Sequence, residues 1–256
     1  MLNTLFRGYY GAITHVTTKS PKLALTFDDG PNPKYTPNLL DILEKYKANA
    51  TFFIVGKSAQ NHPGIIDDIL AGGNEIACHS WSHASFPTLT RKKRIEEIRK
   101  CEASLNGKLK KYFRPPYGHL NFFSHLDVAL LGYKLVTWSI SSNDWLDYDA
   151  NWMTDKIIRK TKPGSIVLMH DALFTYTDQR YRNRTGTIEA VDRILNALNQ
   201  QYQFVTLTEL INAGKPHYKK WVSLPDKTWL NGLKIDKDRH EKKKTQAMLN
   251  AKRDRE

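Results

Sequence analysis

Two pairs of polar residues have the types and spacing to bind a metal ion or to move a proton. Asp28 and Asp29 follow a short apolar run, and His79 and His83 lie four residues apart just after another. Neighbouring side chains on an extended chain point in opposite directions, so the two carboxylates could have different roles. Two imidazoles at this spacing can converge on one ion, and a carboxylate added to them completes a ligand set for a divalent metal with open positions.

Each of these fragments also has a purely structural interpretation. Asp-Asp-Gly-Pro at residues 28–31 is a good turn sequence, and two of the 9 histidines can be surface groups without a ligand. Three further fragments contain residues of similar interest: Arg-Pro-Pro-Tyr-Gly from Arg114, Asn-Asp-Trp from Asn143, and Leu-Met-His-Asp from Leu168. Taken one at a time, they predict rigid loops, turns or capped core residues as readily as an active site.

Short apolar runs precede several of these fragments and are typical of buried parallel strands. Helical periodicity lies between the runs; Thr36 followed by Pro37, for example, predicts a helix that has Thr36 as its N-cap. The runs are rich in β-branched and aromatic side chains and cover residues 23–27, 50–55, 75–78, 134–140, 165–169 and 203–207.

This alternation of strands and helices predicts an α/β fold with a parallel sheet. The chain has no dinucleotide-binding fingerprint, which favours a distorted or incomplete (β/α) barrel. The reacting groups of such barrels lie where strands end and loops begin. Most of the polar fragments occur at such positions.

Composition excludes several classes of protein. The chain has 256 residues, of which 40% are hydrophobic and 25% charged, so it can bury a core and is not a disordered chain. Its 2 cysteines are too few for a disulfide scaffold, and no apolar run approaches the roughly 18 residues of a membrane span. No secretory signal is evident at the start. We therefore expect a cytoplasmic location for the chain as written, and an extracytoplasmic one if an export segment precedes it.

Positive charge is concentrated at the C-terminal end. From Lys215 onward there are 13 basic and 6 acidic residues, so more than half of the net charge of +13 lies there. A solvated helix or frayed end is the simpler interpretation. The alternative is attraction to an anionic surface, such as a wall polymer, a membrane or nucleic acid. The rest of the chain offers no nucleic-acid-binding fold, so we expect no nucleic-acid partner.

Together, the five fragments resemble the motifs of the polysaccharide deacetylases, carbohydrate esterase family 4, whose domain is also called the NodB-homology domain. The motifs occur in the family's order as TFDDG, HSWSH, RPPY, a partial segment ending in DW, and LMH. The resemblance implies a polysaccharide deacetylase domain at residues 21–214, between an N-terminal extension at 1–20 and a basic tail at 215–256. It also implies a hydrolase that removes acetyl groups from N-acetylglucosamine units of chitin oligomers or peptidoglycan and releases acetate.

The resemblance also implies one divalent metal ion held by Asp29, His79 and His83. Zinc is the default, and cobalt or nickel suits the same ligands. In amide hydrolysis such an ion lowers the pKa of its water, so that a nearby carboxylate can take the proton. The family's catalytic base corresponds to Asp28, and Arg114 corresponds to the residue that orients it.

The remaining roles also come from the family. His170 matches the general acid that protonates the departing amine, and the backbone N–H of Tyr117 matches a donor to the oxyanion. The residues that the resemblance implies beside the acetyl group and the sugar ring are Trp145, Leu168, Asp144 and Pro116.

One position departs from the family pattern. In many members the fourth motif begins with an aspartate that supports the acid histidine, and Ser141 stands there in this chain. A serine cannot stabilise an imidazolium by charge, so we expect a lowered pKa for His170, or a replacement carboxylate from Asp144 or Asp171. An unsupported acid leads to the alternative function, a carbohydrate-binding relic that keeps the fold and has lost turnover.

Overall fold

The computed structural model describes residues 11–146, 148–176 and 179–226. The chain divides into two compact units, Met1–Val222 and Ser223–Glu256, and the description below concerns the first unit. The start of the predicted extension and the predicted tail beyond residue 226 lie outside the described residues, so both interpretations of that tail, a solvated end or contact with an anionic surface, stay predictions.

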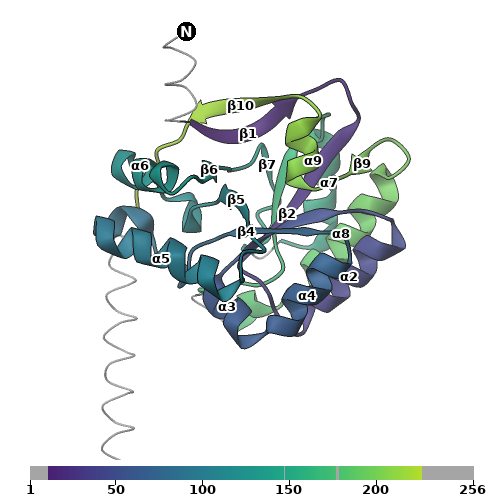
Figure 1. The fold of residues 1–256 in the computed structure, drawn as a ribbon. Helices are drawn as coiled ribbons and strands as arrows, with labels where there is room; N and C mark the ends of the chain where they lie inside the picture. Colours follow the sequence, from purple (N-terminus) through teal and green to yellow (C-terminus); the bar gives the residue numbers. More distant parts are fainter. Residues whose placement is uncertain (1–10, 147, 177–178, 227–256) are drawn as a thin grey trace, which may run out of the picture. The chain divides into compact units, whose positions relative to one another are not determined.

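A parallel sheet forms the centre of this unit, with the strand order β6-β5-β4-β3-β2-β8-β7 (Figure 1). A further short strand, β9 (Gln203–Phe204), pairs with the start of β2. The strands of the main order are β2 (Lys22–Asp28), β3 (Ala50–Ile54), β4 (Glu75–Cys78), β5 (Lys110–Phe113), β6 (Lys134–Leu135), β7 (Ile140–Ser141) and β8 (Ile166–His170). The predicted α/β fold with a parallel sheet is confirmed.

The connection between β6 and β7 shows that this sheet is curled. The two strands lie at opposite ends of the strand order, yet only residues 136–139 separate them. Five steps along the chain span at most about 18 Å, so the two edges of the sheet must approach each other. The predicted incomplete (β/α) barrel is therefore confirmed.

Strand β1 (Gly11–Thr17) lies against Val136, which follows β6, and against Ser165, which precedes β8. The N–H of Thr137 donates to the carbonyl of Ile13 at 2.8 Å, and the N–H of Val16 donates to the carbonyl of Gly164 at 2.9 Å. On its other side β1 pairs antiparallel with β10 (Lys215–Lys220), as Figure 1 shows. Segments that the sequence places in the N-terminal extension and in the tail thus form paired strands of the barrel unit.

Helices pack against the strands of the barrel through the side chains that they bury. In α8 the buried residues Ala190, Val191, Ile194 and Leu195 recur at helical spacing, and burying one such large side chain contributes about 1.5 to 3 kcal/mol. The helices are α2 (Tyr35–Lys45), α3 (Gly56–Asn61), α4 (Pro63–Ala71), α5 (Arg91–Ser104), α6 (Phe122–Leu130), α7 (Ala150–Lys160), α8 (Thr185–Leu198) and α9 (Leu207–Asn212).

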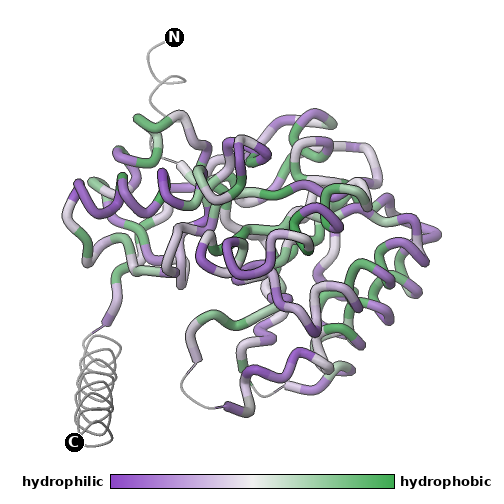
Figure 2. The backbone as a smooth tube through the Cα atoms, turned by 60° about the horizontal axis from the view of Figure 1, so that its bottom comes forward, coloured by the Kyte–Doolittle hydropathy of each residue, from purple (hydrophilic) through white to green (hydrophobic). Residues whose placement is uncertain are grey.

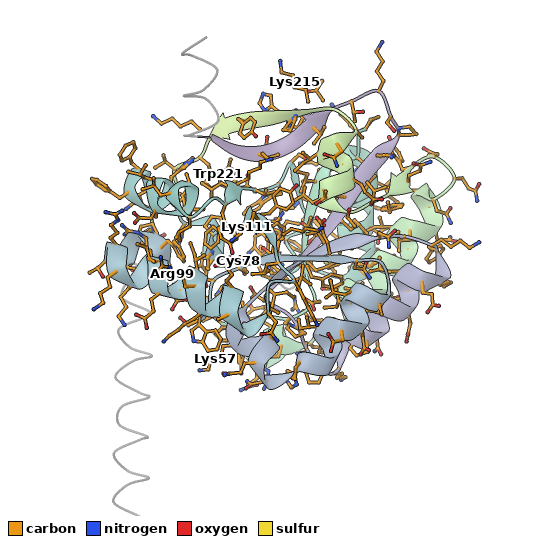
Figure 3. All side chains as sticks on the ribbon, viewed as in Figure 1. Lys57, Cys78, Arg99, Lys111, Lys215 and Trp221 are labelled. Carbon is orange, nitrogen blue, oxygen red and sulfur yellow. The ribbon has the colours of Figure 1, made fainter. Side chains whose placement is uncertain are left out.

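Hydropathy follows the same layers. Figure 2 shows hydrophobic residues along the central strands and alternating hydrophobic and hydrophilic residues along the outer helices. Cys78, at the end of β4, lies inside the molecule, whereas Lys57 and Lys215 lie at its margins (Figure 3). Among the described residues, no helix combines the length and the apolar character that crossing a membrane requires.

The predicted start of α2 is wrong in one detail. The helix begins at Tyr35, so Thr36 lies inside its first turn and is not the N-cap. The Thr36 hydroxyl instead accepts the N–H of Asn32 at 2.7 Å and donates to Asp171 at 2.5 Å. The Thr36 side chain therefore bonds to Asp171, the buried residue after β8, and does not cap the helix.

Candidate active site

The carboxyl ends of the parallel strands bring the predicted site residues to one end of the barrel. Asp28 is the last residue of β2 and is the register partner of His170, the last residue of β8. His79 follows β4 directly, and Arg114 follows β5 directly. Because the strands are parallel, side chains far apart in the sequence meet there.

The three predicted metal ligands, Asp29, His79 and His83, form one buried cluster. The Nε2 atoms of His79 and His83 lie 3.3 Å and 3.0 Å from Oδ1 of Asp29. One ligand atom from each residue lies within 4.8 Å of the others. Asp29 and His83 have φ angles of 78° and 57°, uncommon left-handed conformations that turn their side chains toward this point.

The chemistry of this cluster fits a divalent metal ion. Oδ1 of Asp29 is buried and has no hydrogen-bond partner, so a cation would complete its environment. Nδ1 of His79 contacts the carbonyl oxygen of Arg114 at 2.8 Å, and Nδ1 of His83 contacts Oγ1 of Thr175 at 3.0 Å. With a proton on each Nδ1, both Nε2 lone pairs face Asp29, which is how histidines ligate zinc.

The electrostatics of Asp29 favour the same interpretation. Burial alone raises the pKa of its carboxyl, but His83 and His79 outweigh burial and hold that pKa well below its usual range. Two imidazole nitrogens and a carboxylate oxygen that face one another repel unless a cation lies between them. That cation is either a proton on an imidazole or a metal ion, so metal binding releases a proton here.

Beside the cluster, Arg114 fixes the orientation of Asp28. Nη1 of the fully buried Arg114 lies 2.7 Å from Oδ1 of Asp28 and also donates to the hydroxyl of Thr26 at 2.8 Å. Nη2 donates to the carbonyl of Thr137 at 2.9 Å. The other carboxylate oxygen of Asp28 lies 3.8 Å from Nε2 of His79. One oxygen is therefore committed to Arg114, and the other faces the metal cluster.

His170 has a carboxylate partner, and that partner is Asp144. Nδ1 of His170 lies 2.8 Å from Oδ1 of Asp144, whose Oδ2 accepts the backbone N–H of His170 at 2.8 Å. Burial lowers the pKa of His170, but the carboxylate of Asp144, helped by the two aspartates of the first motif, raises it to about 9. The expected lowering of the His170 pKa is wrong. The other expectation, a replacement carboxylate, holds, and Asp144 supplies it.

Ser141 and Asp171 are not partners of His170 in this arrangement. The hydroxyl of Ser141 donates to Oδ1 of Asn143 at 2.8 Å. Asp171 is buried, accepts from Thr36, and lies where a Cβ on Gly30 would come within 2.1 Å of its Oδ2. Burial raises its pKa to about 7. Asp171 therefore packs against Gly30, the residue that follows Asp28 and Asp29, and only glycine fits at this position.

The four predicted substrate-binding residues differ in their surroundings. Trp145 is partly exposed, and its ring meets that of His170 edge-on at 5.5 Å. Pro116 and Leu168 are buried, Pro116 two residues after Arg114 and Leu168 two residues before His170. Asp144 is only 3% exposed and its carboxylate contacts His170, so the structure gives it a supporting contact to that histidine, and its assignment to substrate contact stays a prediction.

Tyr117 lies in the short 3₁₀ helix Pro116–Gly118 with a φ of 59°. This left-handed conformation is uncommon for a residue with a side chain and is held by tertiary contacts. Its ring packs edge-on against His83 with centroids 4.4 Å apart. The predicted role of its backbone N–H toward the oxyanion stays a prediction.

The segment that follows β8 contains two residues that sequence reasoning missed. The backbone N–H of Phe174 donates to Oδ2 of Asp29 at 2.9 Å, and Thr175 contacts His83. A third missed residue is the buried Arg184, which donates to the backbone carbonyl of Asp144 at 2.6 Å. None of the three stands in a motif, and no spacing in the sequence connects them to the site.

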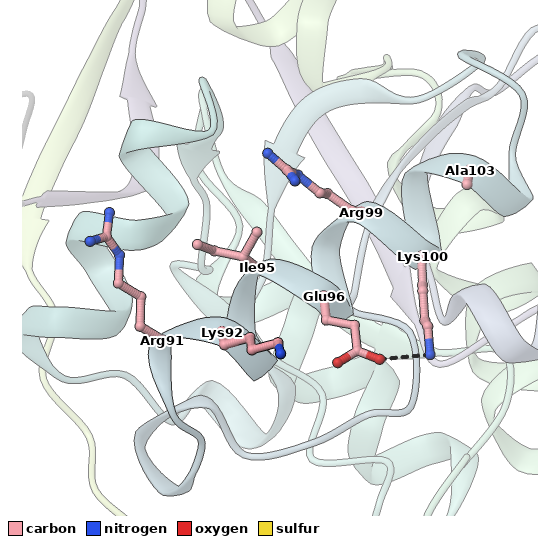
Figure 4. Close-up of a pocket in the computed structure, with 7 residues that line it drawn as sticks. All are labelled: Arg91, Lys92, Ile95, Glu96, Arg99, Lys100 and Ala103. Carbon is pink, nitrogen blue, oxygen red and sulfur yellow. Dashed lines mark ion pairs between the residues drawn. The ribbon is translucent and has the colours of Figure 1, made fainter.

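A separate hollow of about 810 Å³ lies along α5 (Figure 4). None of the predicted site residues lines it, and Glu96 there contacts Lys100 at 2.8 Å. Its described lining consists of Arg91, Lys92, Ile95, Glu96, Arg99, Lys100 and Ala103.

Comparison with known proteins gives consistent matches. A family profile described as polysaccharide deacetylase matches residues 15–136. The chain is 33% identical over 207 residues to a peptidoglycan-N-acetylglucosamine deacetylase of Bacillus cereus, covering 78% of this chain and 93% of that protein. It is 30% identical over 201 residues to a chitooligosaccharide deacetylase of Sinorhizobium fredii, covering 75% and 93%.

Two further matches concern a longer relative and a solved structure. The chain is 34% identical over 206 residues to the peptidoglycan-N-acetylmuramic acid deacetylase PdaC of Bacillus subtilis; the match covers 77% of this chain and only 40% of that relative. A crystal structure of a peptidoglycan N-acetylglucosamine deacetylase superposes with a TM-score of 0.73 at 28% identity, covering 85% of this chain and 100% of the other.

Proposed function

This chain belongs to the polysaccharide deacetylase family, and from that premise we propose that it is a metal-dependent hydrolase. Its reaction removes the acetyl group from N-acetylglucosamine units of peptidoglycan or chitin oligosaccharides and releases acetate. The observation that carries this proposal is the buried meeting of Asp29, His79 and His83. The carboxylate of Asp28 lies beside that cluster, and His170 is the register partner of Asp28 on the neighbouring strand β8.

Asp28 acts as the general base. Arg114 occupies Oδ1 of Asp28 and keeps the carboxylate in one orientation. Oδ2 faces the metal cluster and accepts a proton from the attacking water. The water oxygen then adds to the acetyl carbon, and the backbone N–H of Tyr117 donates a hydrogen bond to the oxyanion.

Asp29, His79 and His83 would hold the divalent ion, with zinc as the first choice and cobalt or nickel as alternatives. When bound, the ion supplies Lewis-acid chemistry, which polarises a carbonyl group and makes water a better nucleophile at neutral pH. The partners on Nδ1 of each histidine hold the rings in place for this purpose.

His170 acts as the general acid. A pKa raised to about 9 keeps its imidazole protonated at neutral pH. Its Nδ1–H is directed to Asp144, so the proton on Nε2 passes to the sugar nitrogen as the C–N bond breaks. The products are acetate and the free amine. Trp145 and Leu168 line the site beside the acetyl group and the sugar ring.

The alternative of a binding relic rested on the acid histidine being unsupported at Ser141. The contact between Asp144 and His170 removes that reason. The first experiment measures acetate release with added Zn²⁺ from N-acetylglucosamine oligomers of several lengths and from peptidoglycan fragments. We expect release by the wild-type chain and none by Asp28→Ala. Release at the same rate by both proteins would contradict the proposal.

A further inference from the structure

Thr175 joins two residues of the site that come from different parts of the chain. Its Oγ1 lies 3.0 Å from Nδ1 of His83, and the phenol of Tyr117 donates to the same oxygen at 2.9 Å. The rings of His83 and Tyr117 also pack edge-on against each other. One hydroxyl group thus contacts a predicted metal ligand and the residue proposed to bind the oxyanion.

The direction of the hydrogen bond to His83 follows from its other nitrogen. Nε2 faces Asp29 at 3.0 Å, so it carries either a proton or a metal ion. When Nε2 binds a metal ion, the imidazole proton lies on Nδ1, and Nδ1–H donates to Thr175. Oγ1 of Thr175 then accepts from both His83 and Tyr117, which uses both of its lone pairs.

The two histidines of the cluster differ in how they are held. Nδ1 of His79 contacts a backbone carbonyl, that of Arg114, at the end of a barrel strand. Nδ1 of His83 depends on the side chain of Thr175, an exposed residue in the otherwise partly buried segment after β8. The neighbouring N–H of Phe174 donates to Asp29. This segment therefore contacts two of the three predicted ligands.

We propose that Thr175 is a positioning residue for the metal site, an inference that rests on the proposed function. It acts through His83, whose ring it orients and whose Nε2 it makes more basic by accepting a hydrogen bond from Nδ1–H. It acts through Tyr117 by fixing the phenol, and with it the strained turn that presents the Tyr117 backbone. Thr175 itself contacts neither the metal ion nor the acetyl group.

Metal affinity is the most direct readout, because a loss of such a partner typically weakens metal binding about 10- to 100-fold. Thr175→Val keeps the branched shape and removes the hydroxyl, whereas Thr175→Ser keeps the hydroxyl. Thr185→Val is the matched control, because Thr185 is an exposed threonine at the start of α8. Thr175→Ala serves as a second removal of the hydroxyl should the valine disturb the segment.

The experiment measures the Kd for Co²⁺ by competition with a chelator, with the full chain in each case. We expect Thr175→Val and Thr175→Ala to bind Co²⁺ about 10-fold or more weakly than the wild type. Thr175→Ser and Thr185→Val should bind within about 2-fold of it, as expected when the accepting hydroxyl is kept. Metal-free thermal unfolding should be the same for all five proteins, because position 175 is exposed.

Two results would overturn the proposal: wild-type affinity in both hydroxyl-free variants, or an equal loss in the serine variant. Failure of the proposed function is a different outcome. In that case the wild-type chain itself neither binds Co²⁺ nor releases acetate. If the wild type does both and Thr175→Val is unchanged, only the role of Thr175 is wrong.

Discussion

Contacts between carboxylates and cations occur at nearly the same distance in two very different regions. On the outer face of α5, Glu96 lies 2.9 Å from Lys93 and 2.8 Å from Lys100. At the end of the barrel, Asp28 lies 2.7 Å from Arg114. The lysine side chains on α5 are 54% to 62% exposed, whereas Arg114 is fully buried.

The difference in burial decides what each contact does. On α5 the hydrogen bonds from Lys100 and Lys93 lower the pKa of Glu96 to about 2, yet water and salt screen such pairs and they stabilise proteins little. In the barrel no water replaces a lost partner, so removing one member leaves an uncompensated charge. The distance between two charged groups therefore does not show whether their ion pair stabilises the protein; burial decides it. Variants in the two regions should differ accordingly.

The largest effect should come from Asp28→Asn, which removes the proposed base. We expect acetate release to fall by about 10²- to 10⁴-fold, the usual contribution of a general base. The rate of acetate release with saturating Zn²⁺ measures it. Zn²⁺ affinity should stay close to that of the wild type, because Asp28 is not one of the three proposed ligands. Retention of most of the activity would mean that another group takes the proton.

The next effect concerns stability, in Arg114→Gln. The substitution leaves the carboxylate of Asp28 buried without its partner, so the free energy of unfolding should fall by about 3 to 5 kcal/mol. Urea denaturation of the metal-free protein measures this change. Lys100→Gln on α5 is the matched comparison and should leave the urea midpoint unchanged. An equal loss in the two variants would remove the distinction between the regions.

A third variant, Asp144→Asn, should change the pH dependence. Asp144 raises the pKa of His170, so without this charge the acid should lose its proton at lower pH. The alkaline limb of kcat/KM should shift downward by about 1 to 3 pH units. Ser141→Ala is the control and should not shift this limb, because Ser141 contacts Asn143. A shift of the alkaline limb in Ser141→Ala but not in Asp144→Asn would mean that Ser141, and not Asp144, supports His170.

The same raised pKa links His170 to the stability of the fold. A group whose pKa is higher in the folded state contributes stability fully at pH values below its usual pKa of 6.5. That contribution disappears as the pH rises through about 9. The stability that Asp144 adds through His170 should therefore be lost above this pH, and the difference between the unfolding midpoints of the wild type and Asp144→Asn should shrink accordingly. Unfolding midpoints measured at several pH values check this.

The smallest effect should come from Glu96→Gln on α5, the same chemical change as Asp28→Asn. We expect unchanged acetate release and an unchanged melting temperature, because the exposed pair is replaced by hydration. Thermal unfolding and the acetate assay check both. A clear loss of activity would show that the face of α5 takes part in the reaction.

The sequence predicts well where chemistry follows directly from strand ends. Asp28, His79, Arg114 and His170 each end or follow a strand, so strand periodicity and motif order place them together. Pairing across long distances is less predictable. Nothing local indicates that β1 pairs with β10 and lies beside Val136 and Ser165, because all these partners lie more than a hundred residues away.

The carboxylate that bonds to the imidazole of His170 does not follow from the sequence alone. Two carboxylates, Asp144 and Asp171, are candidates to replace the aspartate that Ser141 stands for, and tertiary packing chooses between them. The segment after β7 turns Asp144 toward the imidazole, while Thr36 and Gly30 hold Asp171 elsewhere. Thr175 gave no signal at all, since its role exists only once three distant segments meet.

Return of activity on metal titration tests the central claim most directly. The wild-type chain is stripped of metal with a chelator, and acetate release is followed as Zn²⁺ is added. We expect no activity in the stripped protein and full activity at one Zn²⁺ per chain, with no return of activity in His83→Ala. Full acetate release by the stripped protein, unchanged by added Zn²⁺, would contradict the account.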